Sequence, residues 1–137
     1  MTAATSPRAG FWLRFLATLV DAILVGALAR LFRVHGPALI LIWTVYHIVM
    51  WGLKGATVGG LVVGTRIVRT DGSPIDFSIA VVRSLASFLS VAGLLLGFFW
   101  AGWSPQKQSW HDIIAGTYVV KIRPSLQPAP VPAPANQ

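Results

Sequence analysis

Three long apolar runs constrain this chain of 137 residues more than any other feature. They cover about residues 11–32, 37–53 and 78–103. A helix needs about 20 apolar residues to cross the hydrocarbon core of a bilayer, so the first run fits, the second is slightly short and the third is long. Apolar residues make up 55% of the sequence, which is more than a soluble domain of this size can bury. The chain is therefore predicted to be an integral membrane protein.

The first two runs are predicted to form an antiparallel helical hairpin. Only residues 33–36 separate them, and Pro37 suits the first turn of a helix. At about 1.5 Å per residue from the hairpin tip, Asp21 and His47 both lie roughly 15 Å deep, near the middle of the membrane. The two side chains can meet if both face the contact between the helices.

The third run is open to two interpretations. If it crosses the membrane once, the eleven Lys and Arg residues are divided almost evenly between the two sides. If it bends at Gly93 or Gly97 and returns, nine of them share one side. The positive-inside rule favours the second arrangement, with the N-terminus and the loop of residues 54–77 in the cytoplasm.

Two β-like runs are also predicted. The stretch TRIVRTDGSPIDF, residues 65–77, contains a tight-turn signal at Asp71-Gly72, and AGTYVVKIRP, residues 115–124, is a second such run. They can pair if both lie on the same side of the membrane. We therefore expect an all-α membrane fold, with a helical hairpin, a third long or bent helix and a small β-like surface element.

The expected domain organisation is simple. A transmembrane domain stands between an N-terminal tail and a disordered tail rich in Pro and Ala. The N-terminal tail is expected at residues 1–10, the transmembrane domain at residues 11–123 and the tail rich in Pro and Ala at residues 124–137.

The sequence provides few groups for a metal, a cofactor or catalysis. There is no cysteine and there are only four acidic residues, so neither a thiolate site nor a metal site is expected. The glycines of residues 55–64 lack the ending of a phosphate-binding loop, and the serines of residues 84–90 have no matched base. We expect no enzymatic activity and no cofactor. The net charge is +7, and the Lys and Arg residues that produce it are scattered between the apolar runs. This pattern predicts contact with anionic lipid headgroups rather than with nucleic acid.

Three stretches follow one another in a specific order: RFLATLVD from residue 14, GATVGGLVVGTRIVRTDGSPIDFSIAVVRS from residue 55, and SPQKQSWHDIIAGTYVV from residue 104. Together they resemble the RDD family of small membrane proteins, which is named for one arginine and two aspartates. The matching residues here are Arg14, Asp21 and Asp112, and the resemblance implies that they form a polar network. One position differs, because Gly60 stands where family members often carry lysine. Transport of unidentified ligands has been suggested for the family, and cation–proton exchange for some members.

Asp21 has a functional and a structural interpretation. An acid near the bilayer centre costs roughly 3 kcal/mol on insertion scales, so it needs a partner inside the protein. Arg14, His47 and Arg83 are the candidates. The functional interpretation is a proton or cation site formed by Asp21 with His47. The structural one is a polar pair that determines how the helices pack.

Asp112 is predicted to lie on a short interfacial helix that ends at Gly116. His111 is its neighbour, but adjacent residues on a helix point in different directions, so the two are not a ready acid–base pair. We expect Asp112 to accept hydrogen bonds or to pair with Arg66 or Arg83, and so to hold this segment against the membrane core.

Three functional classes remain from the sequence, of which a membrane enzyme is the least favoured. The first is a non-enzymatic membrane module that assembles with itself or with a membrane-protein partner, in which Arg14, Asp21 and Asp112 are structural anchors. The second is a transporter of a cation or small solute, coupled to protons through Asp21. Because so few helices leave little room for a transport path, this second function requires an oligomer or a partner protein.

Overall fold

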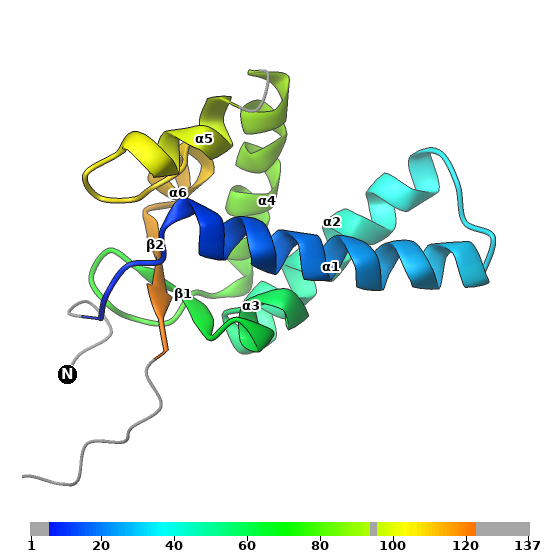
Figure 1. The fold of residues 1–137 in the computed structure, drawn as a ribbon, viewed down its shortest axis with the longest axis horizontal. Coiled ribbons are helices and arrows are strands. Elements are labelled where there is room, and N and C mark those ends of the chain that lie inside the picture. Colours follow the sequence, from blue (N-terminus) through cyan, green and yellow to red (C-terminus); the bar gives the residue numbers. More distant parts are fainter. Residues whose placement is uncertain (1–5, 94–95, 123–137) are drawn as a thin grey trace, which may run out of the picture.

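The computed structural model describes residues 6–93 and 96–122, so the predicted tail of residues 124–137 lies outside the described part of the chain. The elements occur in one chain order (Figure 1). They are α1 (Phe11–Leu31), α2 (Pro37–Lys54), α3 (Val58–Val62), β1 (Thr65–Arg69), α4 (Phe77–Ala92), α5 (Leu96–Trp103), α6 (Trp110–Ala115) and β2 (Thr117–Lys121). The predicted all-α membrane fold with a small β element is confirmed.

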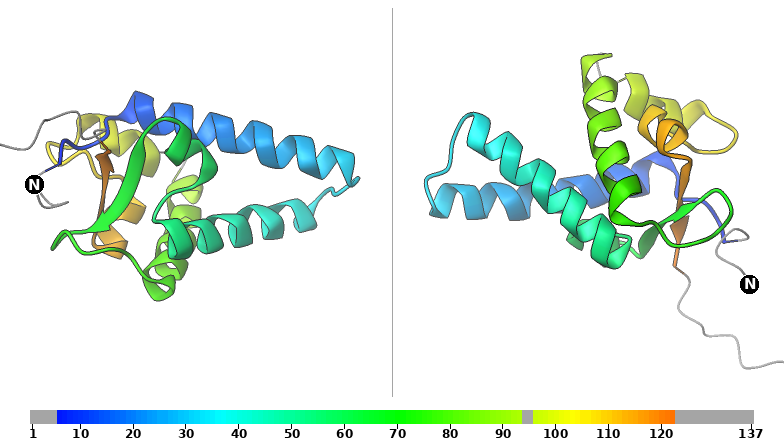
Figure 2. Two further views of the ribbon diagram at one scale, coloured as in Figure 1. Left: turned by 90° about the horizontal axis from the view of Figure 1, so that it is seen from below. Right: turned by 180° about the vertical axis from the view of Figure 1, so that it is seen from behind.

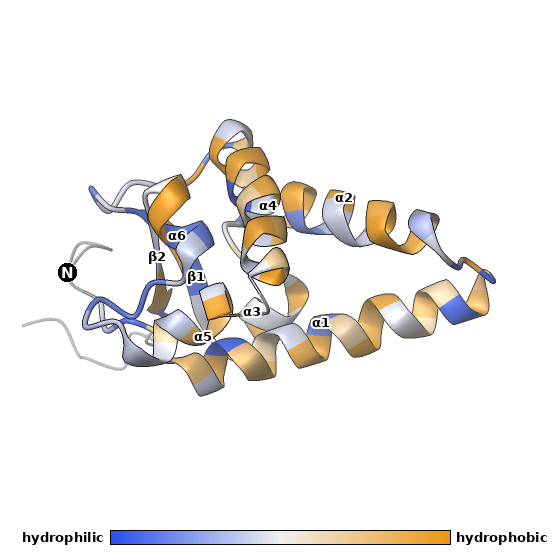
Figure 3. Ribbon diagram, turned by 90° about the horizontal axis from the view of Figure 1, so that it is seen from above, coloured by the Kyte–Doolittle hydropathy of each residue, from blue (hydrophilic) through white to orange (hydrophobic). Residues whose placement is uncertain are grey.

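The predicted hairpin is formed by α1 and α2, which are both long and apolar enough to cross a membrane. Its two arms spread apart from the tip, and α3 lies at the wide end (Figure 2). Most residues along both arms are apolar (Figure 3). In an 18-residue apolar stretch of each helix, only 17% of the residues of α1 and 11% of those of α2 are buried inside the protein. The hairpin therefore leaves most of its surface to lipid or to other helices.

The helix α1 packs mainly against α3 rather than against α2. Its buried residues recur at every fourth position, so they form one face of the helix: Ala17, Asp21, Val25 and Ala29. On the other side of this contact, Gly59 allows the two backbones to approach closely. A Cβ atom added to Gly59 would lie 2.0 Å from the carbonyl oxygen of Ala17.

The third apolar run forms two helices, α4 and α5, whose axes are bent by 98°. The break between them includes Gly93, one of the two predicted bend points. The other, Gly97, lies in α5 and packs on Ser90, since an added Cβ would lie 2.6 Å from the Ser90 hydroxyl oxygen. In two views α4 runs across the hairpin rather than alongside it (Figures 1 and 2).

The two β-like runs pair as predicted. Strands β1 and β2 are antiparallel, with Ile67 opposite Val119. Residues 7–9 flank the other edge of β2, where the Ala9 N–H donates to the Val119 carbonyl oxygen at 2.8 Å. The turn after β1 contains Gly72 with φ 85°, which agrees with the Asp71-Gly72 turn signal. This sheet gathers the segment before α1, the middle loop and the end of the described chain at the end of the molecule opposite the hairpin tip (Figure 1).

We expect Gly59→Ala to lower the thermal unfolding temperature of the protein in mild detergent by several degrees. The added methyl group must displace the backbone of α1, and overpacking of this kind costs about 2 kcal/mol. Gly102→Ala, in α5, is the matched control, because an added Cβ on that exposed glycine meets only Phe11, at an ordinary contact distance of 3.6 Å. Unfolding temperatures that are the same for both variants would contradict the α1–α3 contact.

Candidate functional site

Five of the seven predicted site residues fall into two separate buried clusters. The Asp112 cluster consists of Arg14, Arg83, Ser109, His111, Asp112 and Thr117. The Asp21 cluster consists of Asp21, Tyr46, Thr57 and Gly59. Asp21 is 2% exposed and Asp112 is 0% exposed. The arginine and two aspartates of the sequence motif are thus all buried or half-buried, but they do not form one network.

A capping box at the start of α6 determines the position of Asp112. The Ser109 hydroxyl donates to Asp112 Oδ2 at 2.7 Å, and the Ser109 N–H donates to the same oxygen at 2.8 Å. The bond from the Ser109 N–H satisfies a backbone group that a helix N-terminus otherwise leaves without a partner. The helix ends at Gly116 in the left-handed conformation, as the sequence predicts.

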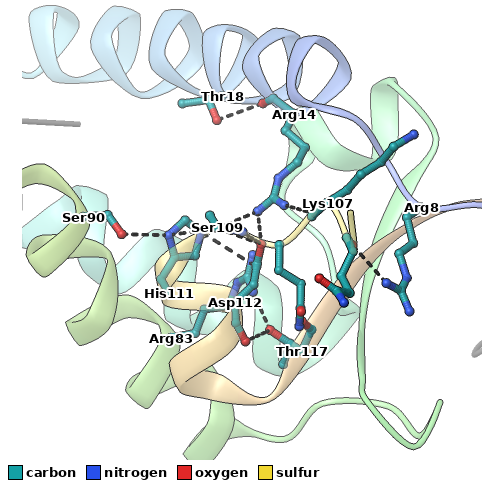
Figure 4. A network of polar contacts seen from close by, with 12 residues as sticks. Arg8, Arg14, Thr18, Arg83, Ser90, Lys107, Ser109, His111, Asp112 and Thr117 are labelled. Atoms are coloured by element: carbon teal, nitrogen blue, oxygen red, sulfur yellow. Dashed lines mark hydrogen bonds and ion pairs between the residues drawn. The ribbon is translucent and has the colours of Figure 1, made fainter. Parts of the chain in front are cut away.

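Two arginines from distant segments converge on Asp112 (Figure 4). Nη2 of Arg14, on α1, lies 2.5 Å from Asp112 Oδ2, while Nη1 of Arg83, on α4, contacts Oδ1. Arg14 also donates to the Ser109 hydroxyl at 3.0 Å. Arg83 also donates to the hydroxyl of Thr117, on β2, at 2.6 Å. One carboxylate therefore connects α1, α4 and α6, and Arg83 extends the connection to β2.

The Asp112 cluster holds its carboxylate in the charged form. Burial alone would raise the pKa of Asp112, but the guanidinium groups of Arg14 and Arg83 outweigh it and hold that pKa well below its usual range. Burial lowers the pKa of His111 to about 3, so the imidazole is neutral at physiological pH. Its Nε2 lies 3.8 Å from Asp112 Oδ1 and 2.9 Å from the Ser109 hydroxyl oxygen. His111 and Asp112 therefore form no direct hydrogen bond, in agreement with the helical geometry.

In the described part of the chain, the groups that hydrogen-bond to the Asp21 carboxylate are all neutral. The Tyr46 hydroxyl donates to Oδ1 at 2.6 Å, the Thr57 hydroxyl donates to Oδ2 at 2.6 Å, and the Gly59 N–H donates to Oδ1 at 2.7 Å. Within residues 6–93 and 96–122, no Lys, Arg or His forms an ion pair with Asp21. Helix α1 is thus joined at this point to α2 and α3.

His47 lies next to this cluster in sequence but does not hydrogen-bond to Asp21. Its Nδ1 lies 2.9 Å from the Trp43 carbonyl oxygen, on the same helix. Its ring packs between the rings of Trp43, at 4.4 Å, and Trp51, at 5.0 Å, measured between centroids. Arg66 is exposed on β1, so of the two arginines considered for Asp112 only Arg83 contacts it.

Four of the polar partners were not anticipated from the sequence: Tyr46, Thr57, Ser109 and Thr117. The spacing Ser109-x-x-Asp112 is a recognisable capping-box pattern and is sufficient to find Ser109. Thr57 precedes a glycine-rich stretch and caps α3 by accepting from the Gly60 N–H at 3.1 Å. For Tyr46 and Thr117 the sequence carries no comparable signal. In the part of the chain that the structure describes, no group of three His, Cys, Asp or Glu residues is placed to hold a metal ion.

We expect Asp112→Asn to destabilise the protein by about 3–5 kcal/mol, because it leaves two guanidinium groups without their shared counter-charge in a buried site. Thermal unfolding in mild detergent, followed by tryptophan fluorescence, measures the change. Asp71→Asn is the control, because Asp71 is exposed in a turn and asparagine keeps an acceptor for the N–H of Ser73. Equal stability of the two variants would show that the Asp112 cluster does not hold the fold together.

Comparisons with known proteins agree with the motif. The sequence model of the RDD family matches residues 31–116, a range that includes Arg83 and Asp112 and begins at the end of α1. The uncharacterized protein YckC of Bacillus subtilis is 28% identical over 132 residues, which cover 85% of this chain and 86% of YckC. The uncharacterized membrane protein YteJ of the same organism is 26% identical over 141 residues, which cover 85% of this chain and 82% of YteJ.

A further relative is longer than this chain. The proline-rich antigen homolog of Mycobacterium tuberculosis is 30% identical over 100 residues, which cover 72% of this chain but only 41% of that relative. No solved structure matches the chain. The family model extends over more than half of the sequence. The two Bacillus proteins match this chain over most of their own length. The chain therefore belongs to the RDD family, and it is a membrane protein with two candidate transmembrane helices.

Proposed function

We propose that this protein is a non-enzymatic membrane module that assembles with further copies of itself. The observation that carries the proposal is the enclosure of the Asp112 cluster. Asp112 is 0% exposed and Arg83 is 2% exposed, and the Asp112 carboxylate forms ion pairs with both Arg83 and Arg14. A group that no substrate reaches is suited to holding helices together and not to acting on a ligand.

The spread hairpin supports assembly. Between its arms lies an apolar groove of about 230 Å³, which extends from Tyr46 to Phe32 near the tip. On α1, Ala22 and Gly26 are exposed and stand four residues apart. Small residues at this spacing let transmembrane helices approach closely, which is a common basis of helix association in bilayers. Neither Ala22 nor Gly26 lines the groove, so the hairpin has two surfaces that suit a helix of a second copy: the groove and the Ala22–Gly26 face of α1.

The proposed orientation places the sheet end in the cytoplasm, and with it the N-terminus and the loop of residues 54–77. Cations gather at this end: Arg8, Lys54, Arg66, Arg69, Lys107 and Lys121. The hairpin tip carries Arg30 and Arg33. By the positive-inside rule, the more basic end stays in the cytoplasm.

Assembly is tested by the mass of the protein in mild detergent and by chemical cross-linking in liposomes. We expect oligomers for the wild type and a loss of most of the oligomer for Gly26→Leu, because a bulky side chain prevents close approach at this position. Val49→Leu, on the exposed part of α2, is the control and should assemble normally. A wild type that is monomeric in detergent and in liposomes would overturn the proposal.

A second candidate function rests on the Asp21 cluster, whose carboxylate has only neutral donors. Such a site exchanges a proton or a cation without disturbing another charge, as coupled transport through an intramembrane acid requires. If the protein is a transporter, proteoliposomes with the wild type should show proton-coupled cation flux that is lost in Asp21→Asn, while that variant keeps its fold. Absence of flux in the wild type, together with loss of folding or assembly in Asp21→Asn, favours the module instead.

A further inference from the structure

A pocket of about 390 Å³ lies at the sheet end of the molecule, where α2 ends and β1 passes beside it. Its lining combines two cationic side chains, Lys54 and Arg66, with an apolar wall that includes Leu53, Ile67 and Ile75. No acidic residue lines it. It is separate from both buried carboxylate clusters, since it shares no residue with either of them.

The two cations come from different elements, and nothing in the described part of the chain neutralises them. Lys54 is the last residue of α2, and Arg66 is on β1. Both are exposed, and neither forms an ion pair within residues 6–93 and 96–122. Two positive charges that face one pocket repel each other, so an anion between them is favoured.

The acids nearest in sequence are engaged in other contacts. The Asp71 carboxylate accepts from the N–H and the hydroxyl of Ser73, at 2.8 and 2.5 Å. The Asp76 carboxylate caps α4 by accepting from the Ile79 N–H at 2.9 Å, and its other oxygen lies 3.9 Å from Arg69. The acids of the described residues therefore provide no counter-charge to Lys54 and Arg66, which leaves both cations available to a bound anion.

The depth of the pocket in the membrane indicates what kind of molecule this is. Helix α2 is a candidate membrane span that ends at Lys54, so the pocket lies where the hydrocarbon layer meets the headgroup layer. At this depth the most abundant anions are lipid phosphates. An arginine fork matches the oxygens of a phosphate, and a lysine adds a point charge. The apolar wall beside them suits the start of an acyl chain.

We propose that this pocket binds an anionic phospholipid, with its phosphate between Lys54 and Arg66 and its glycerol–acyl region along Leu53 and Ile75. The proposal is independent of the proposed function, because a single copy of the chain contains the whole pocket. It concerns a defined site at one end of α2 and not the general attraction of a basic protein to a membrane.

The test is lipid binding by the purified full-length protein in a neutral detergent, measured by native mass spectrometry with dioleoyl phosphatidylglycerol and with dioleoyl phosphatidylcholine. We expect preferential binding of one phosphatidylglycerol per chain. The double variant Lys54→Gln with Arg66→Gln should bind it at least tenfold more weakly, since each cation near a lipid headgroup contributes about 1 kcal/mol. Both residues are exposed, so the variant should keep the wild-type unfolding temperature in lipid-free detergent.

The matched control is the double variant Arg30→Gln with Arg33→Gln, which removes the same charge at the hairpin tip and should change the affinity less than twofold. The charge-preserving variant Lys54→Arg should bind as the wild type does. Equal loss in both double variants would overturn the proposal, because it would mean diffuse attraction to the net charge. Equal binding of the two lipids would also overturn it. Displacement of the lipid by millimolar inorganic phosphate would reassign the pocket to a free anion.

Discussion

The fold depends on the burial of one carboxylate between two guanidinium groups. Asp112 alone cannot remain ionised in a site from which water is excluded, and Arg14 and Arg83 are each too costly to bury without a counter-charge. Together they form an arrangement that is stable only when α1, α4 and α6 are all in place. Since these helices are far apart in the chain, the ion pairs select one tertiary arrangement out of the many that apolar helices alone allow.

This dependence on polar contacts follows from the solvent. Within a bilayer the hydrophobic effect does not drive helices together, because lipid tails are as apolar as leucine. Many of the buried residues are accordingly small or polar, such as Ala17 and Ser90, whereas large apolar side chains cover most of the outside. A small apolar core around Trp51 is also buried. Close approach at Gly59 and Gly97 then brings backbones within reach of the few hydrogen-bonding side chains. Those contacts determine how the helices pack, whereas the apolar surface keeps the protein in the membrane.

Much of the fold is predictable from the sequence, because run lengths and turn residues report it directly. Pro37, the Asp71-Gly72 pair and Gly116 each mark a boundary that the structure reproduces. The short helix α3 is not predictable in this way, because its packing rests on the contact of Gly59 with α1, which is a tertiary feature. The partner of Asp21 shows a second limit. Counting residues places His47 at the correct depth, but one residue along a helix is a rotation of about 100°, and the side chain that reaches Asp21 is that of Tyr46.

The two buried aspartates of the motif differ in the groups that surround them, and this difference separates the functions that each can serve. A proton added to Asp112 would leave Arg14 and Arg83 as two unneutralised charges in a buried site, so this carboxylate is suited to a permanent structural role. A proton or cation added to Asp21 would meet the hydroxyl groups of Tyr46 and Thr57 and the Gly59 N–H, none of which carries a charge. The hydroxyl groups reorient at little cost, whereas a guanidinium group cannot release its charge. The surroundings of Asp112 thus suit a structural contact alone, whereas those of Asp21 join α1 to α2 and α3 and are also compatible with the exchange of a proton or cation.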